Sequence, residues 1–151
     1  MQITEPKRIR HTYTQRLHAP PSDVFPLLCP VREAEWVPGW NPVKVLSFSG
    51  AAEKDCVFIT PGDPNATWVI THHDPSRYEV EMIKFIPNHT VTKLQIALHA
   101  DGANATSADV TYTYTSLSPE GDAFVGEFTE AHYVEFMRNW EKELNNFLVS
   151  T

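Results

Sequence analysis

Two long segments with alternating polarity constrain the fold of this chain more than any other feature. In TVTKLQIALHA, residues 90–100, every second side chain is apolar or small, and SADVTYTYTSL, residues 107–117, shows the same alternation. The short connection DGAN, residues 101–104, joins them. Successive side chains of a strand point to opposite faces. The two segments therefore predict an antiparallel hairpin with one apolar and one polar face.

Five further segments are flanked by turn residues and also predict strands, over residues 8–17, 44–49, 56–60, 67–73 and 77–86. In the first of them, Ile9, His11, Tyr13, Gln15 and Leu17 share one face. Pro20 and Pro21 end this strand, and two short helices are expected at 22–28 and 31–36. An antiparallel sheet of about seven strands follows, and its apolar face needs a cover.

The C-terminal third of the chain predicts that cover. Ser118 is a good helix cap, Pro119 suits the first helical position, and no later proline interrupts the segment. We therefore expect one helix over residues 120–148. Its apolar stripe comprises Tyr133, Phe136, Met137, Trp140, Leu144, Phe147 and Leu148. Upstream, Phe124, Val125, Phe128 and His132 point toward another side, so the first half of this helix is expected to face something different.

Charge and composition exclude several classes of function. The net charge of -7 disfavours binding to nucleic acid, and no run approaches the ~20 apolar residues of a membrane span, so no nucleic-acid partner and no stable membrane insertion are expected. No export signal precedes the first strand. Cys29 and Cys56 form no CxxC motif, which favours two reduced thiols in a cytoplasmic protein. The 151 residues suit a single domain over 1–151.

The segment EAEWVPGWNPVKVL, residues 33–46, places Trp36 and Trp40 on an irregular loop among prolines and a glycine. Large rings on such a loop either plug the edge of a core or line the mouth of a cavity. The sequence leaves these two interpretations equally open.

The order of elements, together with several local motifs, resembles the SRPBCC superfamily, also called START-like or helix-grip proteins. This superfamily includes the birch-pollen allergen, lipid-transfer domains, polyketide cyclases, coenzyme Q-binding proteins and chaperone-ATPase activators. The resemblance covers nearly the whole chain and rests on APPSDVFPLL, EWVPGWNPV, WVITHHDPSRYEVE, VTYTYTSLSPEG and NWEKELNNFL. One departure is SGAAEKDCVF, where many members have a connection richer in glycine.

The resemblance implies an α+β helix-grip fold, in which a curved antiparallel sheet of about seven strands wraps around a long C-terminal helix, with two short helices between strands 1 and 2. It also implies a cavity between sheet and helix. The polyketide cyclase and dehydrase branch is the nearest in character. The residues expected to line the ligand site are His11, Tyr13, Trp36, Trp40, Leu94, Ile96, Tyr112, Tyr114, Phe128, His132 and Phe136.

The sequence offers few groups for catalysis and none for a metal. Only His11 and His132 are candidate acids or bases, because histidine titrates near neutral pH. His72 and His73 are adjacent on a predicted strand and point to opposite faces, so they do not bind one ion together. With no CxxC, P-loop, GxGxxG or GxSxG motif, we expect neither a metal nor a cofactor.

The preferred hypothesis is a non-enzymatic protein that binds a small, largely hydrophobic molecule of lipid, polyketide or isoprenoid type. The main alternative is an enzyme of cyclase or dehydratase type that uses the same cavity, with a histidine or tyrosine as acid or base. A second alternative, implied by the chaperone-activator relatives, is a module that docks a larger protein.

Overall fold

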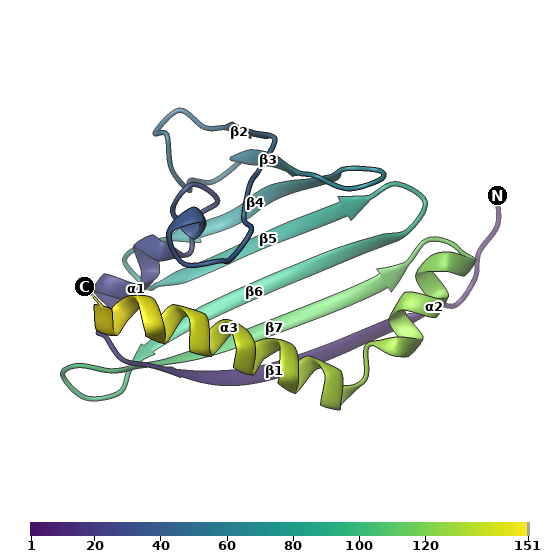
Figure 1. The fold of residues 1–151 in the computed structure, drawn as a ribbon. Helices are drawn as coiled ribbons and strands as arrows, with labels where there is room; N and C mark the ends of the chain where they lie inside the picture. The colour runs from purple at the N-terminus through teal and green to yellow at the C-terminus, as the bar shows by residue number, and fades with distance from the viewer. Residues whose placement is uncertain (151) are drawn as a thin grey trace.

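Seven antiparallel strands form one sheet, and the C-terminal helix lies along one face of it (Figure 1). The computed structural model describes residues 1–150. The strands are β1 (Arg8–Leu17), β2 (Lys44–Leu46), β3 (Val57–Thr60), β4 (Ala66–Asp74), β5 (Glu79–Ile86), β6 (Thr90–Ala100) and β7 (Thr106–Ser116). Their order across the sheet is β1-β7-β6-β5-β4-β3-β2. The predicted class of fold is therefore confirmed.

The alternating segments pair as their sequence predicts. In the hairpin of β6 and β7, Leu94 lies opposite Tyr112 and Thr92 opposite Tyr114. β1 adds to the other edge of β7, where Ile9 faces Tyr114. Val110 is completely buried, whereas Lys93 on the opposite face of the sheet is exposed. The apolar face of the sheet is thus the concave, covered face.

β1 and β2 follow each other in sequence but form the two opposite edges of the sheet. The chain between them, residues 18–43, crosses the whole width of the sheet. It contains α1 (Pro21–Val24), a 3-10 turn η1 (Phe25–Leu27) that continues it, and a second 3-10 turn η2 (Arg32–Glu35). These are the short helical pieces that the sequence predicts between the first two strands.

The prediction of a single helix over 120–148 is wrong, because two helices occupy this region. α2 (Pro119–Glu127) ends where Phe128 leaves helical geometry, at φ -87 and ψ 65. α3 (Glu130–Ser150) then begins, and the Thr129 hydroxyl accepts a hydrogen bond from the His132 amide at 3.2 Å. A threonine that caps a new helix start explains the break. Figure 1 shows α2 turned away from the axis of α3.

The second predicted strand is shorter than the expected 44–49, because Glu53 organises the residues that follow β2 into a loop. Its carboxylate accepts hydrogen bonds from the Ser47 hydroxyl and from the amides of Phe48 and Ser49. Hydrogen bonding by the Ser49 side chain is the largest cause that lowers the pKa of Glu53, and these three bonds act in the same direction. Together they lower this pKa to about 2. Backbone amides that bond to a carboxylate are not free to continue a strand ladder.

The core lies between the concave face of the sheet and α3. Tyr133, Met137 and Leu144 are its fully buried helical members, and the Tyr133 hydroxyl donates to the carbonyl of Val110 at 2.6 Å. No helix within residues 1–150 combines the length and the apolar character needed to cross a bilayer.

Candidate functional site: a cavity between sheet and helix

A cavity of about 990 Å³ opens between the concave face of the sheet, α3 and the segment that holds η2. Its walls are mainly aromatic. The rings that line it are Trp36, Trp40, Phe58, Trp68, Tyr112, Tyr114, Phe124, Phe128, Phe136 and Trp140. Such a volume is at the upper end of what small-molecule sites occupy.

The floor of the cavity is a row of residues that runs directly across the sheet. Tyr114 pairs with Thr92, Thr92 with Lys84, Lys84 with Trp68, and Trp68 with Phe58. All five line the cavity. Because directly opposed residues share a face, strand pairing alone places a lysine in the middle of an otherwise apolar and hydroxyl-bearing floor.

The two loop tryptophans both line the cavity and both fix the loop to the core. The indole N–H of Trp36 donates to the carbonyl of Leu27 at 2.9 Å, and that of Trp40 donates to the carbonyl of Pro30 at 2.7 Å. Trp36 also stacks on Trp140 of α3, with ring centroids 5.9 Å apart and planes 9° apart. The two interpretations of this loop are therefore compatible, because the same rings anchor the loop and form one wall.

The helical wall comes from both sides of the α2–α3 break. Phe128, at the break itself, packs on Tyr114 with centroids 4.6 Å apart, and His132 stacks on Phe128 at the same distance. Phe136 contacts Tyr112 edge to face at 5.5 Å and remains 37% exposed. An exposed aromatic ring at this place leaves the cavity open on the α3 side.

Burial shifts the pKa values of two ionisable groups that line the cavity. Burial raises the pKa of Glu33, on η2, to about 8. Burial lowers the pKa of Lys84, whose ammonium lies 5.0 Å from the centre of the Trp68 ring. Neither shift involves the charge of the other group, and no ion pair joins them. Each side chain is half-buried and has no partner of opposite charge among the described residues.

The tyrosines of β7 add hydroxyl groups to the same space. Burial raises the pKa of Tyr112 well above its ordinary value, and the nearby charges of Tyr114, Tyr133 and Glu33 act in the same direction. Burial also raises the pKa of Tyr114. Both groups therefore stay protonated at neutral pH, and a protonated hydroxyl can donate a hydrogen bond.

The structure brings most of the residues expected at the ligand site together. Trp36, Trp40, Leu94, Tyr112, Tyr114, Phe128, His132 and Phe136 all line the cavity. Their roles in binding stay a prediction.

Three expected residues lie outside the cavity lining. The His11 ring stacks on Tyr133, and its Nε2 lies 2.9 Å from the carbonyl of Phe128. The Tyr13 hydroxyl donates to Glu141 at 3.3 Å, and Ile96 is buried in the core. Of the two histidines considered for catalysis, only His132 reaches the cavity, from an exposed position on α3.

The most unusual residues of the site, Glu33 and Lys84, were missed by the sequence reasoning. A signal for Lys84 exists, because Val80, Met82, Lys84 and Ile86 occupy alternate positions of one strand and three of them are apolar. A lysine on such a face points inward. No comparable signal exists for Glu33, which lies on a single 3-10 turn among other acidic residues.

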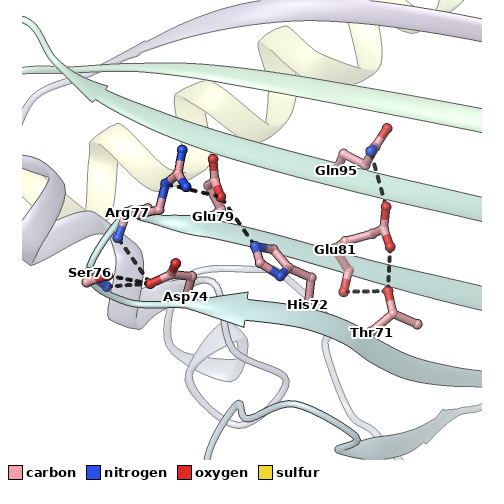
Figure 2. Close-up of polar contacts among 8 residues, drawn as sticks. All are labelled: Thr71, His72, Asp74, Ser76, Arg77, Glu79, Glu81 and Gln95. Carbon is pink, nitrogen blue, oxygen red and sulfur yellow. Dashed lines mark hydrogen bonds and ion pairs between the residues drawn. The ribbon is translucent and has the colours of Figure 1, made fainter.

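A cluster of polar side chains lies at β4 and β5, outside the cavity (Figure 2). Possible ligand atoms of His72, Asp74 and Glu79 lie within 4.8 Å of one another. Each already has protein partners, because Asp74 accepts from Ser76 and from the Arg77 amide, and Glu79 lies 3.3 Å from His72. The neighbouring Arg77 guanidinium, 3.9 Å from Glu79, supplies a positive charge. This arrangement acts as a surface ion-pair network.

His73 points away from that network and packs on Phe25, with ring centroids 5.2 Å apart. The pairing of β4 with β5 shifts register between Ile70 and His72. This shift determines which side chains of the later part of β4 point to each face of the sheet. Upstream of the shift, Trp68 lies on the concave face and its indole N–H donates to Thr60 at 3.0 Å.

Comparison with known proteins gives a match at the level of three-dimensional structure only. No family model matches the chain, and no curated protein matches it by sequence. Norcoclaurine synthase from Thalictrum flavum, solved with dopamine and hydroxybenzaldehyde, superposes with a TM-score of 0.66 at 12% identity, over 92% of this chain and 87% of that one. A score of this size over nearly the whole of both chains shows that they share one fold. The chain has the helix-grip fold.

Two further helix-grip structures span nearly the same length. Ara h 8.0201 gives a TM-score of 0.65 at 10% identity and covers 95% of this chain and 99% of its own. The ZhuI aromatase/cyclase from Streptomyces sp. R1128 gives 0.62 at 15% identity, with 91% and 93% covered. The fold implied by the sequence resemblance is thus confirmed, while identities this low carry no information on chemistry.

Proposed function

We propose that this protein binds a small, largely apolar molecule in the cavity between its sheet and α3. The observation that carries this proposal is the cavity itself, which has about 990 Å³ of space, aromatic walls, and two ionisable groups, Glu33 and Lys84, whose pKa values are shifted by burial and not by an opposite charge. Among the described residues, the indole N–H of Trp140, which lines the cavity, is buried without a hydrogen-bond partner. Such a group costs roughly 1 to 3 kcal/mol, so a ligand that accepts a hydrogen bond from it gains both affinity and selectivity. Norcoclaurine synthase, which shares the fold, holds small aromatic molecules.

The size of the apolar contribution sets the character of the binding. A ligand that buries ~300 Å² of apolar surface gains about 7 to 8 kcal/mol, and association costs at least ~4 kcal/mol of this. Apolar contact alone therefore gives weak binding to many molecules. The polar groups of the floor and of η2 must provide the selectivity. Two free, buried thiols, Cys29 and Cys56, support a reducing compartment such as the cytoplasm as the place of action.

Blocking the cavity tests the proposal. Leu94 is buried, lines the cavity and lies in the centre of the sheet, so Leu94→Trp fills the space with an indole ring. We expect this variant to lose binding of the neutral fluorescent dye phenylnaphthylamine, while Lys93→Trp, on the exposed face of the same strand, retains it. Undiminished dye binding by a folded Leu94→Trp variant would refute the proposal. Native mass spectrometry of the purified protein then identifies any molecule that it carries.

A second function, an enzyme of cyclase or dehydratase type, is favoured by one specific observation. The pKa of Glu33, about 8, lies close to neutral pH, where a carboxyl group both donates and accepts protons effectively. If Glu33 is a general acid or base, Glu33→Gln slows turnover of the carried molecule by ~100-fold or more. If the protein only binds, wild type forms no product from that molecule.

A further inference from the structure

Lys84 interrupts the apolar face of β5 at the centre of the cavity floor. Val80 and Met82, on the same face, are 2% and 4% exposed. The lysine side chain lines the cavity and lies between Thr92 on β6 and Trp68 on β4. Lys84 is half-buried at this position, so its ammonium is partly removed from water, which is unfavourable unless other groups replace that water. Its presence therefore needs a compensating interaction.

The protein supplies only part of that compensation. The Trp68 ring, held by its bond to Thr60, presents its face to the ammonium at 5.0 Å, an interaction worth roughly 0.5 to 2 kcal/mol. Among residues 1–150, no carboxylate lies within ion-pair distance of Lys84 and no hydrogen bond from its ammonium is present. An ammonium has three donors, so donors remain for an occupant of the cavity.

The other charges of the cavity do not neutralise Lys84. Glu33 is mainly protonated at neutral pH because its pKa is about 8. Glu135, Glu143 and His132 line the cavity from α3, where Glu135 and His132 are exposed and Glu143 is half-buried. Water and salt screen these charges near the opening more strongly than the charge on the floor. Among the described residues that line the cavity, Lys84 is the only lysine or arginine, in a protein whose net charge is -7.

We propose that Lys84 recognises the anionic group of an acidic ligand, a small molecule with an apolar, ring-containing body and a carboxylate or similar oxyanion. This inference rests on the proposed function and adds the class of ligand to it. The apolar body packs between the aromatic walls, and the oxyanion accepts charge-assisted hydrogen bonds from the Lys84 ammonium. Outside the cavity, the negative net charge repels anions, so selection for an acid depends on this one side chain.

A matched pair of dyes tests the inference without knowledge of the natural ligand. Anilinonaphthalene sulfonate and phenylnaphthylamine share their aromatic body, and only the first is an anion. Lys84→Met keeps the length of the side chain and removes its charge, Lys84→Arg keeps a charge, and Lys93→Met removes an exposed charge from the opposite face of the sheet. Affinities are measured by fluorescence titration of each purified, folded variant.

We expect Lys84→Met to bind the sulfonate about tenfold or more weakly than wild type, which is the scale of a hydrogen bond to a charged group. Its affinity for the neutral dye should stay within about twofold, Lys84→Arg should retain most of the sulfonate affinity, and Lys93→Met should match wild type. An unchanged sulfonate affinity in Lys84→Met, or an equal loss for both dyes, would overturn the inference and leave the proposed function intact. Failure of both dyes to bind wild type would overturn the proposed function itself.

The stability of the dye-free protein provides a second readout. If Lys84 serves a ligand, replacing this poorly solvated cation by methionine raises the melting temperature of the empty protein. A lower melting temperature would show that Lys84 supports the fold, and this result also overturns the inference.

Discussion

At the scale of single residues, the site depends on side chains whose ordinary charge is unfavourable where they lie. Glu33 is half-buried beside the cavity, and no hydrogen bond within the described residues satisfies its carboxyl group. Burial alone raises its pKa to about 8. The carboxyl group is thus mainly protonated at neutral pH and ionises only as the pH rises past about 8. This behaviour makes its effect on stability dependent on pH.

Replacing Glu33 with glutamine should stabilise the protein at high pH only. The folded carboxyl has a pKa of about 8 against an ordinary value of 4.5, so between these values the folded state holds a proton that the unfolded state has lost. Stability therefore falls as pH rises through this window and levels off above it. We expect Glu33→Gln to gain ~1 to 3 kcal/mol over wild type at about pH 9, and almost nothing at about pH 4.

Urea unfolding at both pH values measures this difference, and Glu135→Gln is the matched control on the exposed side of the cavity. An equal effect of Glu33→Gln at both pH values would show that the carboxyl group does not titrate as described.

His11 provides a second test, because its contacts indicate a structural role. Its ring stacks on Tyr133, and its Nε2 bonds to the carbonyl of Phe128, where α2 ends. His11→Ala should therefore lower the free energy of unfolding by ~1 to 2 kcal/mol and leave affinity for phenylnaphthylamine unchanged. His99→Ala, on an exposed position of β6, should change neither quantity appreciably. Loss of dye affinity with unchanged stability would instead place His11 at the ligand site.

At the scale of elements, alternation predicts strands well and helical periodicity predicts the break in the helix poorly. The apolar face of β6 and β7 follows directly from sequence, because each side chain has one of two directions. The rotation of Phe124, Val125 and Phe128 relative to the later stripe did indicate a different environment for the first half of the helix. It did not locate the break, because a threonine can also lie on the exposed face of a continuous helix. Only the structure shows that the Thr129 hydroxyl caps the start of α3.

The position of α2 can be tested through its two glycines. A Cβ at Gly121 would lie 2.1 Å from the carbonyl oxygen of His89 and 2.6 Å from the Ser116 hydroxyl, whereas one at Gly126 meets no atom within 4 Å. Gly121→Ala should therefore destabilise the protein by ~2 kcal/mol or more. Gly126→Ala should be neutral or stabilise it by up to ~1 kcal/mol, because alanine favours a helix. Thermal unfolding compares the two, and similar effects would contradict this packing of α2.

At the scale of the whole molecule, the resemblance to a known superfamily predicted the cavity. It did not predict that Glu33 and Lys84 would line that cavity. Strand order cannot be read from alternation, so the row that brings Lys84 next to Trp68 and Thr92 becomes visible only when β4, β5 and β6 are paired. The sequence singled out Trp36 and Trp40 because rings on an irregular loop need an explanation, and both line the cavity. Which wall they form depends on the course of the crossing segment over the sheet.

The sheet should unfold locally from one edge. β2 pairs over three residues with β3, whereas β7 is paired along its whole length with β1 and β6. Amide hydrogen exchange should therefore be fastest in β2 and slowest in β7. A ligand of the cavity should slow exchange in η2 and the Trp36 to Trp40 loop most, since these residues form a wall with few ladder bonds. Uniform protection across the sheet would contradict this gradient.

Because residues 18–43 cross from one edge of the sheet to the other, the segment that carries Glu33, Trp36 and Trp40 contributes nothing to strand pairing. Its core residues, among them Val24 and Leu27, are fixed by packing, but substitutions at its cavity-lining positions leave the pairing from β3 to β1 untouched. Part of the cavity wall is thus carried by a stretch of chain that is separate from the strand ladder. A lineage with this architecture can reshape that wall through the residues of the crossing segment that line it, while the strands that carry Lys84 and the tyrosines stay paired.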